Sequence, residues 1–94
     1  MITINEYFDG QVKSMAINSG VLPATIGVML AGDYTFGTDK REVMTVVQGE
    51  LIVKLPGENI KQTFKNGQVF EVPANSKFDV TVVIDTAYLC QYCE

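Results

Sequence analysis

The sequence predicts an all-β protein, a sandwich or barrel of about nine short strands. Apolar and polar residues alternate with a period of two along most of the 94 residues, whereas helical periodicity is hard to find. Turn residues interrupt the alternation about every 8–12 residues, a spacing typical of sandwiches and barrels. A chain of this length allows one domain, covering residues 1–94, and closing its sheet would remove exposed strand edges.

Each predicted strand is an alternating or β-branched run that lies next to a turn signal. The strands, in order, cover residues 12–17, 25–30, 33–36, 43–48, 51–55, 61–64, 68–72, 78–84 and 87–92. The turn signals, in order, are Asp9-Gly10, Pro23, Ala31-Gly32, Gly49-Glu50, Pro56-Gly57-Glu58-Asn59, Asn66-Gly67, Pro73-Ala74-Asn75-Ser76 and Asp85-Thr86. Asn66-Gly67 is the strongest short hairpin signal, because both residues tolerate the positive φ that a two-residue hairpin turn requires.

Composition and charge exclude several classes of function. Seven basic residues scattered among eleven acidic ones give a net charge of −4, which does not supply the clustered cations that duplex nucleic acid requires. A free nucleoside or nucleotide is not excluded, since a pocket holds such ligands. No apolar run is long enough to span a bilayer, and the N-terminus lacks a signal-peptide pattern. We therefore expect a cytoplasmic protein that does not bind membranes.

The two cysteines, Cys90 and Cys93, form a C-x-x-C motif. A zinc site needs four ligands, and the chain has no histidine and no second cysteine pair. A redox-active pair of the thioredoxin type opens a helix after a strand, whereas this pair lies in the last five residues. Strand alternation also directs the two side chains to opposite faces. We expect two unpaired, reduced thiols.

The middle of the chain carries two spaced motifs that resemble those of the cupin family. Glu42 precedes Gly49 by seven positions, and Gly67 precedes Pro73 by six, with Phe78 five further on. In cupins these motifs hold histidine ligands and one glutamate. The resemblance places Phe36 and Thr38 at the first two histidine positions and Phe78 at the last, so that only Glu42 keeps a ligand-type side chain.

This resemblance implies a jelly-roll-like cupin-type β-barrel, and the absence of histidine predicts that the barrel holds no metal and no cofactor. A lone carboxylate is a poor site for a transition metal, which prefers several nitrogen or sulfur donors. The interior becomes a slot with aromatic rings, hydroxyls and one carboxylate. Such a slot suits a small organic ligand that has a flat apolar part and polar substituents.

A narrower resemblance covers the chain almost end to end. The matching segments are Asn5-Glu6-Tyr7-Phe8, Val12-Lys13-Ser14, Gly27-Val28-Met29, Gly32-Asp33-Tyr34-Thr35-Phe36, Met44-Thr45-Val46, Leu55-Pro56, Phe70-Glu71-Val72-Pro73 and Tyr88-Leu89-Cys90. Together they look like the pyrimidine/purine nucleoside phosphorylases, a family of small cupin-fold proteins. The resemblance implies phosphorolysis of purine and pyrimidine nucleosides with inorganic phosphate, which gives a free base and α-D-ribose 1-phosphate. It also implies a homodimer.

Phosphorolysis needs a group that favours the cationic sugar of the transition state, and Glu42 is the catalytic candidate. Its carboxylate can accept hydrogen bonds from the 2′- and 3′-hydroxyls of the sugar. Any base can stack on aromatic rings, which would explain broad specificity. The candidates for contact with base or sugar are Tyr34, Phe36, Thr38, Thr45, Phe78 and Tyr88.

Phosphate binding requires cations and hydroxyl donors. Lys13 next to Ser14, and Ser76 next to Lys77, each pair a cation with a hydroxyl, and Arg41 is able to bind phosphate bidentately. Lys40 is a further basic candidate. Each candidate also has an ordinary structural role open to it: core packing for the rings and solvated surface for the cations. The residue that protonates the leaving base is left open, because no histidine is present.

Three other functions remain open at this point. The chain is compatible with a metal-free barrel that binds or senses a nucleoside- or sugar-like ligand without catalysis. A sugar isomerase or epimerase is a second alternative, although it usually needs a histidine or tyrosine acid/base pair. A purely structural dimeric domain is the third. Fold alone does not decide among them.

Overall fold

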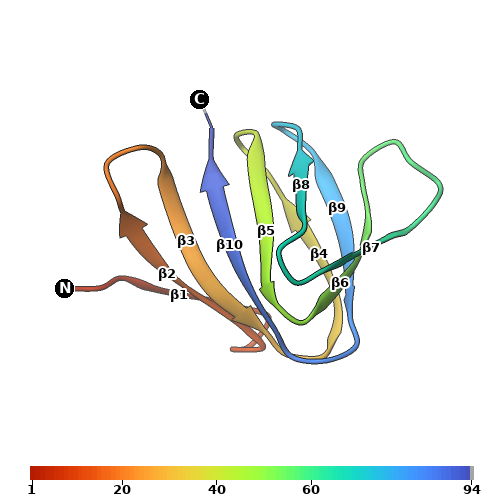
Figure 1. The fold of residues 1–94 in the computed structure, drawn as a ribbon, viewed down its shortest axis with the longest axis horizontal. Helices are drawn as coiled ribbons and strands as arrows, with labels where there is room; N and C mark the ends of the chain where they lie inside the picture. Colours follow the sequence, from red (N-terminus) through yellow and green to blue (C-terminus); the bar gives the residue numbers. More distant parts are fainter. Residues whose placement is uncertain (94) are drawn as a thin grey trace.

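The computed structural model describes residues 1–93, which fold into ten strands and no helix, arranged as two antiparallel sheets (Figure 1). The six-stranded sheet has the order β1 (Ile4–Tyr7), β2 (Val12–Asn18), β3 (Pro23–Met29), β10 (Thr86–Tyr92), β5 (Glu42–Gln48) and β8 (Val69–Val72). The four-stranded sheet has the order β4 (Gly32–Gly37), β9 (Lys77–Val82), β6 (Glu50–Lys54) and β7 (Gln62–Lys65). The all-β prediction is confirmed.

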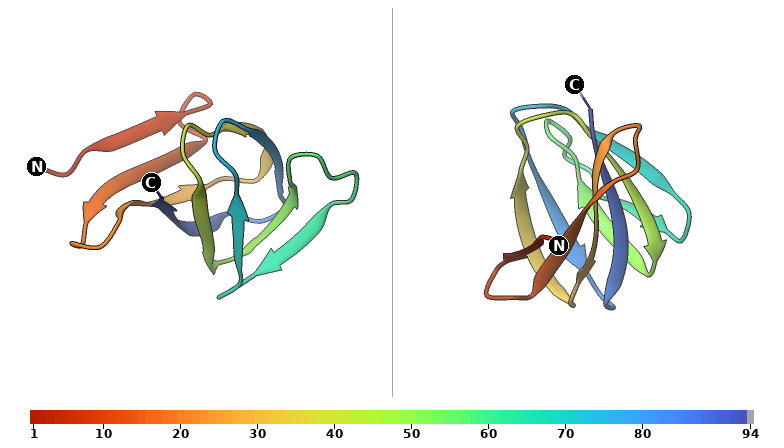
Figure 2. Two further views of the ribbon diagram at one scale, coloured as in Figure 1. Left: turned by 90° about the horizontal axis from the view of Figure 1, so that it is seen from above. Right: turned by 90° about the vertical axis from the view of Figure 1, so that its left-hand side faces the viewer.

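All nine predicted strands are present, with ends that differ by at most two residues from those expected. The tenth, β1, forms a hairpin with β2 and was not predicted. Together β1, β2 and β3 extend the six-stranded sheet to one side of the four-stranded sheet (Figure 2). The expected closure into one continuous barrel is wrong, because no ladder joins the two sheets within residues 1–93. Each sheet therefore keeps two edge strands.

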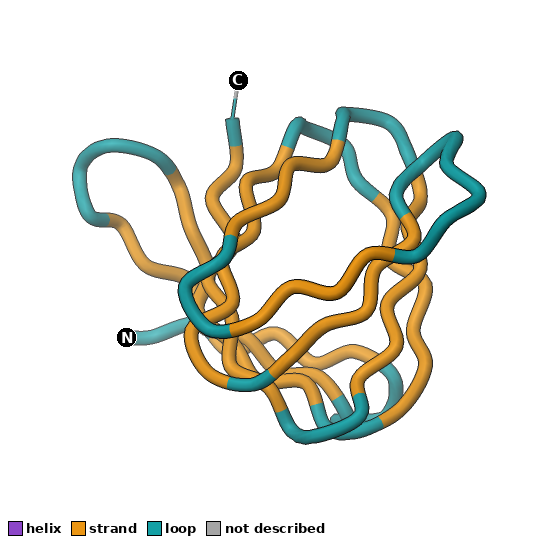
Figure 3. Tube along the Cα trace, turned by 45° about the vertical axis from the view of Figure 1, so that its right-hand side comes forward, coloured by secondary structure: helices purple, strands orange, loops and turns teal. Residues whose placement is uncertain are grey.

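The chain crosses repeatedly between the two sheets, as the tube in Figure 3 shows. The prediction of a hairpin at Asn66-Gly67 is wrong, because the chain passes from one sheet to the other at this turn. The turn itself forms, since the Gln68 N–H donates to the Lys65 carbonyl at 2.9 Å and Gly67 has a φ of 81°. The strands that it joins belong to different sheets, however, because β7 pairs with β6 and β8 pairs with β5.

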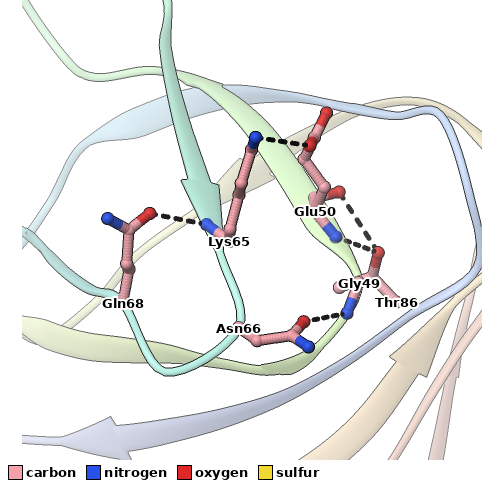
Figure 4. A network of polar contacts seen from close by, with 6 residues as sticks. All are labelled: Gly49, Glu50, Lys65, Asn66, Gln68 and Thr86. Carbon is pink, nitrogen blue, oxygen red and sulfur yellow. Dashed lines mark hydrogen bonds and ion pairs between the residues drawn. The ribbon is translucent and has the colours of Figure 1, made fainter.

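Three of these crossings meet in a hydrogen-bonded corner (Figure 4). The Asn66 side-chain oxygen accepts a hydrogen bond from the Gly49 N–H at 2.6 Å. The Thr86 hydroxyl accepts one from the Glu50 N–H at 3.0 Å and donates to the Ile84 carbonyl at 2.8 Å. Gly49 has a φ of +121°, and a Cβ there would collide with the Thr86 side chain, so this position requires glycine.

The apolar core lies between the sheets, because alternate residues of every long strand point inward. On β5, Met44 and Val46 are buried, while the flanking Val43 and Thr45 face the other side. The inner face changes character along its length. At the corner end the buried side chains around Leu51 are mainly apolar, and at the opposite end, where β5 begins and β10 ends, more polar side chains join the wall. The candidate site lies at that end.

Candidate functional site

A cavity of about 100 Å³ opens between the two sheets where β5 begins and β10 ends. Strands from both sheets contribute to its wall. The lining residues are Tyr7, Ser14, Met29, Phe36, Gly37, Glu42, Met44, Phe78, Tyr88, Cys90 and Tyr92. Five of the sequence-predicted site residues are among them, and they come together from five different strands: Ser14, Phe36, Glu42, Phe78 and Tyr88.

Strand register brings Glu42 to the cavity wall beside the end of β10. Glu42 is the first residue of β5 and is the cross-strand partner of Tyr92. Cys90, two residues earlier on β10, faces the same side, and its thiol donates a hydrogen bond to Glu42 Oε1 at 3.4 Å. Because neighbouring residues of a strand alternate between faces, Tyr88 also points inward. Tyr88, Cys90 and Tyr92 therefore share the inner face of β10.

Burial raises the pKa of four ionisable side chains in the cavity wall. Burial raises the pKa of Glu42, and the negative charge of Asp39 raises it further, whereas the hydrogen bond from Cys90 acts in the opposite direction. Burial also raises the pKa of Cys90 and Tyr92, and it raises that of Tyr88 to about 12. These three groups stay protonated and neutral near neutral pH. Glu42 is the one carboxylic acid among the described residues that line the cavity.

The opposite wall is aromatic. Phe36 on β4 and Phe78 on β9 are cross-strand partners, and their ring centroids lie 5.6 Å apart with an interplanar angle of 30°. Tyr34 lies outside the cavity wall: its ring contacts Phe8, and its hydroxyl donates to the Leu30 carbonyl at 2.7 Å. The two rings and the Glu42 carboxyl group therefore line a common space, which is suited to a flat ligand with hydroxyl groups.

A second, wider recess of about 410 Å³ adjoins the cavity. The two spaces share Tyr7, Gly37, Glu42 and Tyr92 as lining residues, so Glu42 lies at their junction. The loop between β4 and β5 adds Asp39 and Lys40 to the outer recess. The inner cavity is smaller than the roughly 300–1,000 Å³ of most small-molecule sites, whereas the outer recess falls within that range.

Two threonines predicted to contact the substrate lie elsewhere. Thr38 is buried between two loops, where its hydroxyl donates to the Pro73 carbonyl at 2.7 Å and accepts from the Ser76 N–H at 3.0 Å. Thr45 follows Met44 on β5 and therefore faces the outer side of the six-stranded sheet. The structure thus gives Thr38 a role in joining the two loops.

Of the predicted phosphate-binding residues, Ser14 alone lines the cavity. The Lys13 side chain lies on the opposite face of β2, and its Nζ atom lies 3.2 Å from Glu6 Oε1. Arg41 lies 3.0 Å from Glu71 on the surface.

Ser76 and Lys77 also lie outside the cavity wall. The Ser76 hydroxyl donates to the Ala74 carbonyl at 3.0 Å, and Lys77 borders a separate surface groove near Asp79. Neither of the expected pairs, Lys13 with Ser14 and Ser76 with Lys77, therefore brings its cation and its hydroxyl together at the cavity.

Several lining residues were not predicted from the sequence, among them Tyr7, Cys90 and Tyr92. Tyr92 shares a face with Tyr88, so strand alternation gave a usable signal for it. Tyr7 belongs to β1, which shows no apolar alternation, and nothing in the sequence pattern indicated that it reaches the cavity.

Within residues 1–93, no group of three or more His, Cys, Asp or Glu side chains lies close enough together to hold a metal ion. Cys90 and Cys93 are both free thiols and both are buried. The described part of the chain also has no helix of the length and hydropathy needed to cross a membrane.

Comparison with known proteins finds relatives that match almost the whole chain. The chain is 61% identical over 92 residues to a pyrimidine/purine nucleoside phosphorylase of Teredinibacter turnerae and 59% identical to one of Saccharophagus degradans; each match covers 98% of both chains. A crystal structure of a protein of unknown function from Vibrio parahaemolyticus superposes with a TM-score of 0.95 at 47% identity, covering 99% of each chain.

A more distant structure supports the fold. An RmlC-like cupin from Shewanella frigidimarina superposes with a TM-score of 0.76 at 20% identity, over 97% of this chain and 82% of the other. The predicted cupin-type fold is therefore confirmed, with two open sheets in place of a closed barrel. The family model for pyrimidine/purine nucleoside phosphorylases matches residues 2–92. The chain belongs to the pyrimidine/purine nucleoside phosphorylase family.

Proposed function

We propose that the protein catalyses phosphorolysis of purine and pyrimidine nucleosides, releasing the free base and α-D-ribose 1-phosphate. Membership of the family and the names of its close relatives support this activity. The observation that carries the proposal for the site is the position of Glu42, at the junction of an aromatic cavity and a wider outer recess. In this proposal the base occupies the inner cavity, the sugar lies at the junction, and the phosphate occupies the outer recess.

The base enters the inner cavity in this proposal. A whole nucleoside exceeds its volume of about 100 Å³, so only one part of the substrate fits inside. The faces of Phe36 and Phe78 favour a flat ring and do not distinguish purines from pyrimidines. Tyr88 and Ser14 add hydroxyl groups that are able to hydrogen-bond with the polar edge of the ring. Stacking without strict hydrogen-bond selection accounts for a broad range of bases.

The sugar lies at the junction, against Glu42. In the transition state the bond from the base to the anomeric carbon breaks, the electron pair leaves with the base, and the sugar ring becomes cationic. A carboxylate that accepts hydrogen bonds from the 2′- and 3′-hydroxyls stabilises that charge. Burial restricts the water that would otherwise compete for Glu42 and strengthens the interaction.

Phosphate approaches the anomeric carbon from the outer recess, one of its oxygens forms the new bond to that carbon, and the departing base takes up the proton that hydrogen phosphate loses. Lys40 is the one cation among the described residues that line this recess, and it is exposed. Its ammonium group is able to hold an oxyanion without placing it directly against Glu42. Lys13 and Arg41 already have carboxylate partners on other surfaces, so they take no part in the proposed site.

We also propose that residues 1–94 act as one domain, as a homodimer in the cytoplasm. The interlocked crossings between the sheets support a single folding unit. Open edge strands in a chain of this size favour association with a second copy. Free thiols at Cys90 and Cys93 are compatible with a reducing compartment.

Incubation of purified protein with a panel of nucleosides, with and without phosphate, tests the activity. Chromatography should detect free base and ribose 1-phosphate in equal amounts, and only when phosphate is present. Base release that does not depend on phosphate would contradict phosphorolysis. Tight nucleoside binding without turnover, unaffected by phosphate, would favour the alternative of a ligand-binding cupin.

A further inference from the structure

The outer face of the six-stranded sheet is unusually apolar for a surface. Six of its side chains each expose between 40% and 60% of their area: Ile4, Met15, Ile17, Val28, Val47 and Val69. Half-buried Ile26, Val43 and Leu89 fill the spaces between them on β3, β5 and β10. All of these residues point away from the core, because their strand neighbours point inward.

The outer face of the four-stranded sheet provides an internal comparison. There Thr35 donates to Asp79, and Thr81 donates to Asp33, each at 2.7 Å. An antiparallel sheet with one face in the core normally has a polar outer face of this kind. Folding alone therefore does not require apolar residues on the outside of the six-stranded sheet. An exposed apolar surface of this extent indicates a binding surface.

Charge on the six-stranded face is confined to its two edges. The Glu6–Lys13 ion pair lies on β1 and β2, and Glu71, paired with Arg41, lies on β8 at the other edge. The central strands β3 and β10 present apolar side chains outward along with Gln91, and no charged residue. An apolar centre with a charged rim is the usual anatomy of an interface between proteins.

The size of this face matches a small specific interface. With about 3.3 Å per residue along a strand and about 4.8 Å between strands, the six strands cover a flat area of about 570 Å². Two such faces in contact bury about 1,100 Å², above the roughly 1,000 Å² expected of a specific interface. Two sheets are also able to pack face to face with their strands about 30° apart.

We infer that a second copy of this chain covers the outer face of the six-stranded sheet, with β3 and β10 at the centre of a two-fold symmetric interface. A two-fold contact uses the same surface on both copies, so one self-complementary apolar face is sufficient. A membrane is a poorer occupant, because the chain has a net charge of −4 and carboxylates at both rims. The inference rests on the proposed homodimer and is independent of the proposed activity.

The test is analytical ultracentrifugation of wild type, Val28→Lys and the matched control Ile52→Lys at micromolar concentration. Val28 is 47% exposed at the centre of the apolar face, and Ile52 is half-buried on the outer face of the other sheet. A two-fold symmetric interface contains position 28 of both copies, so Val28→Lys places two lysines in it. Val28→Lys should therefore weaken association at least about 100-fold, while Ile52→Lys should remain dimeric.

Several outcomes would overturn the inference. A monomeric wild type would remove both this interface and the proposed homodimer, while leaving the phosphorolysis assay to decide the activity separately. A Val28→Lys variant that stays dimeric, or an Ile52→Lys variant that dissociates, would place the interface elsewhere. Isotope-filtered NMR on mixed labelled and unlabelled wild type needs no variant. It should show contacts between copies from the methyl groups of Val28 and Leu89, and their absence in a dimer would refute the inference.

Discussion

Replacing Glu42 with glutamine removes one negative charge from the junction of cavity and recess while keeping the length of the side chain. The Glu42 Oε1 atom accepts a hydrogen bond from the Cys90 thiol at 3.4 Å, and the amide oxygen of glutamine is able to accept the same hydrogen bond. Cross-strand pairing with Tyr92 is a backbone property and should be unaffected. The substitution therefore isolates the charge from the shape of the site.

The expected loss appears mainly in kcat. A carboxylate interacts more strongly with a cationic sugar than with a neutral one, so its charge matters most in the transition state. Removing a preorganised group of this kind costs about 1.4–4 kcal/mol, which corresponds to a fall in kcat of about 10- to 1000-fold. KM for the nucleoside should change less, because the amide of glutamine still hydrogen-bonds to the sugar hydroxyls.

Initial rates of base release, measured by chromatography at saturating phosphate, check this expectation. Glu71→Gln is the matched control, since Glu71 lies on the outer face next to Arg41 and away from the cavity. Its kcat should equal that of wild type. An unaltered kcat in correctly folded Glu42→Gln would refute the assignment. If Glu42→Gln lowers turnover of a 2′,3′-dideoxy nucleoside as much as that of the normal substrate, Glu42 acts away from the diol.

The same variant should show a pH-dependent gain in stability. The pKa of Glu42 is raised above its ordinary value of 4.5, so the folded state disfavours the charged form; the cost is absent below about pH 4.5 and is fully present above the raised pKa. The melting temperature of Glu42→Gln should exceed that of wild type at pH 8, and a difference that grows on acidification would contradict the burial argument. Lys40→Gln should raise KM for phosphate about 10-fold with little change in kcat, while Lys77→Gln should leave both unchanged in the same steady-state assay. Asn66→Ala removes the hydrogen bond to the Gly49 N–H and should lower the free energy of unfolding by about 1 kcal/mol in urea titrations; an unchanged midpoint would show that water replaces the bond.

Strand positions were largely predictable from the sequence, whereas sheet membership was not. Alternation reveals a strand wherever one face is apolar, as on β5 with Met44 and Val46. On β1, Ile4 faces outward, and Asn5 and Tyr7 face inward, so neither face shows a clear pattern. Asn66-Gly67 forms a tight turn as expected, but the same turn chemistry serves a hairpin or a crossing between sheets.

Part of the candidate site was also predictable, and the reason is the period of the strand. Glu42, Phe36 and Phe78 were selected from motif spacing, and all three line the cavity. Lys13 and Ser14 are adjacent on β2, so they necessarily face opposite sides. The side chains of Lys13 and Ser14 therefore cannot both point into one site. Cations were the least predictable, because exposed lysine and arginine side chains find carboxylate partners that the sequence does not reveal.

The corner at one end of the sandwich and the cavity at the other are connected through strand register. Glu42 faces the cavity only while β5 and β10 keep their pairing, because a slip of one residue would place Val43 there and turn the carboxylate outward. The bonds made by Asn66 and Thr86 fix the ends of β5 and β10 at the corner. The pairing of β10 with β5 already shifts by one residue between Ala87 and Tyr88. The register beyond that point therefore depends on where the corner holds the two strands. The corner is therefore one fixed point, together with the ladders to β8 and β3, for the register that turns the Glu42 carboxyl group toward the cavity.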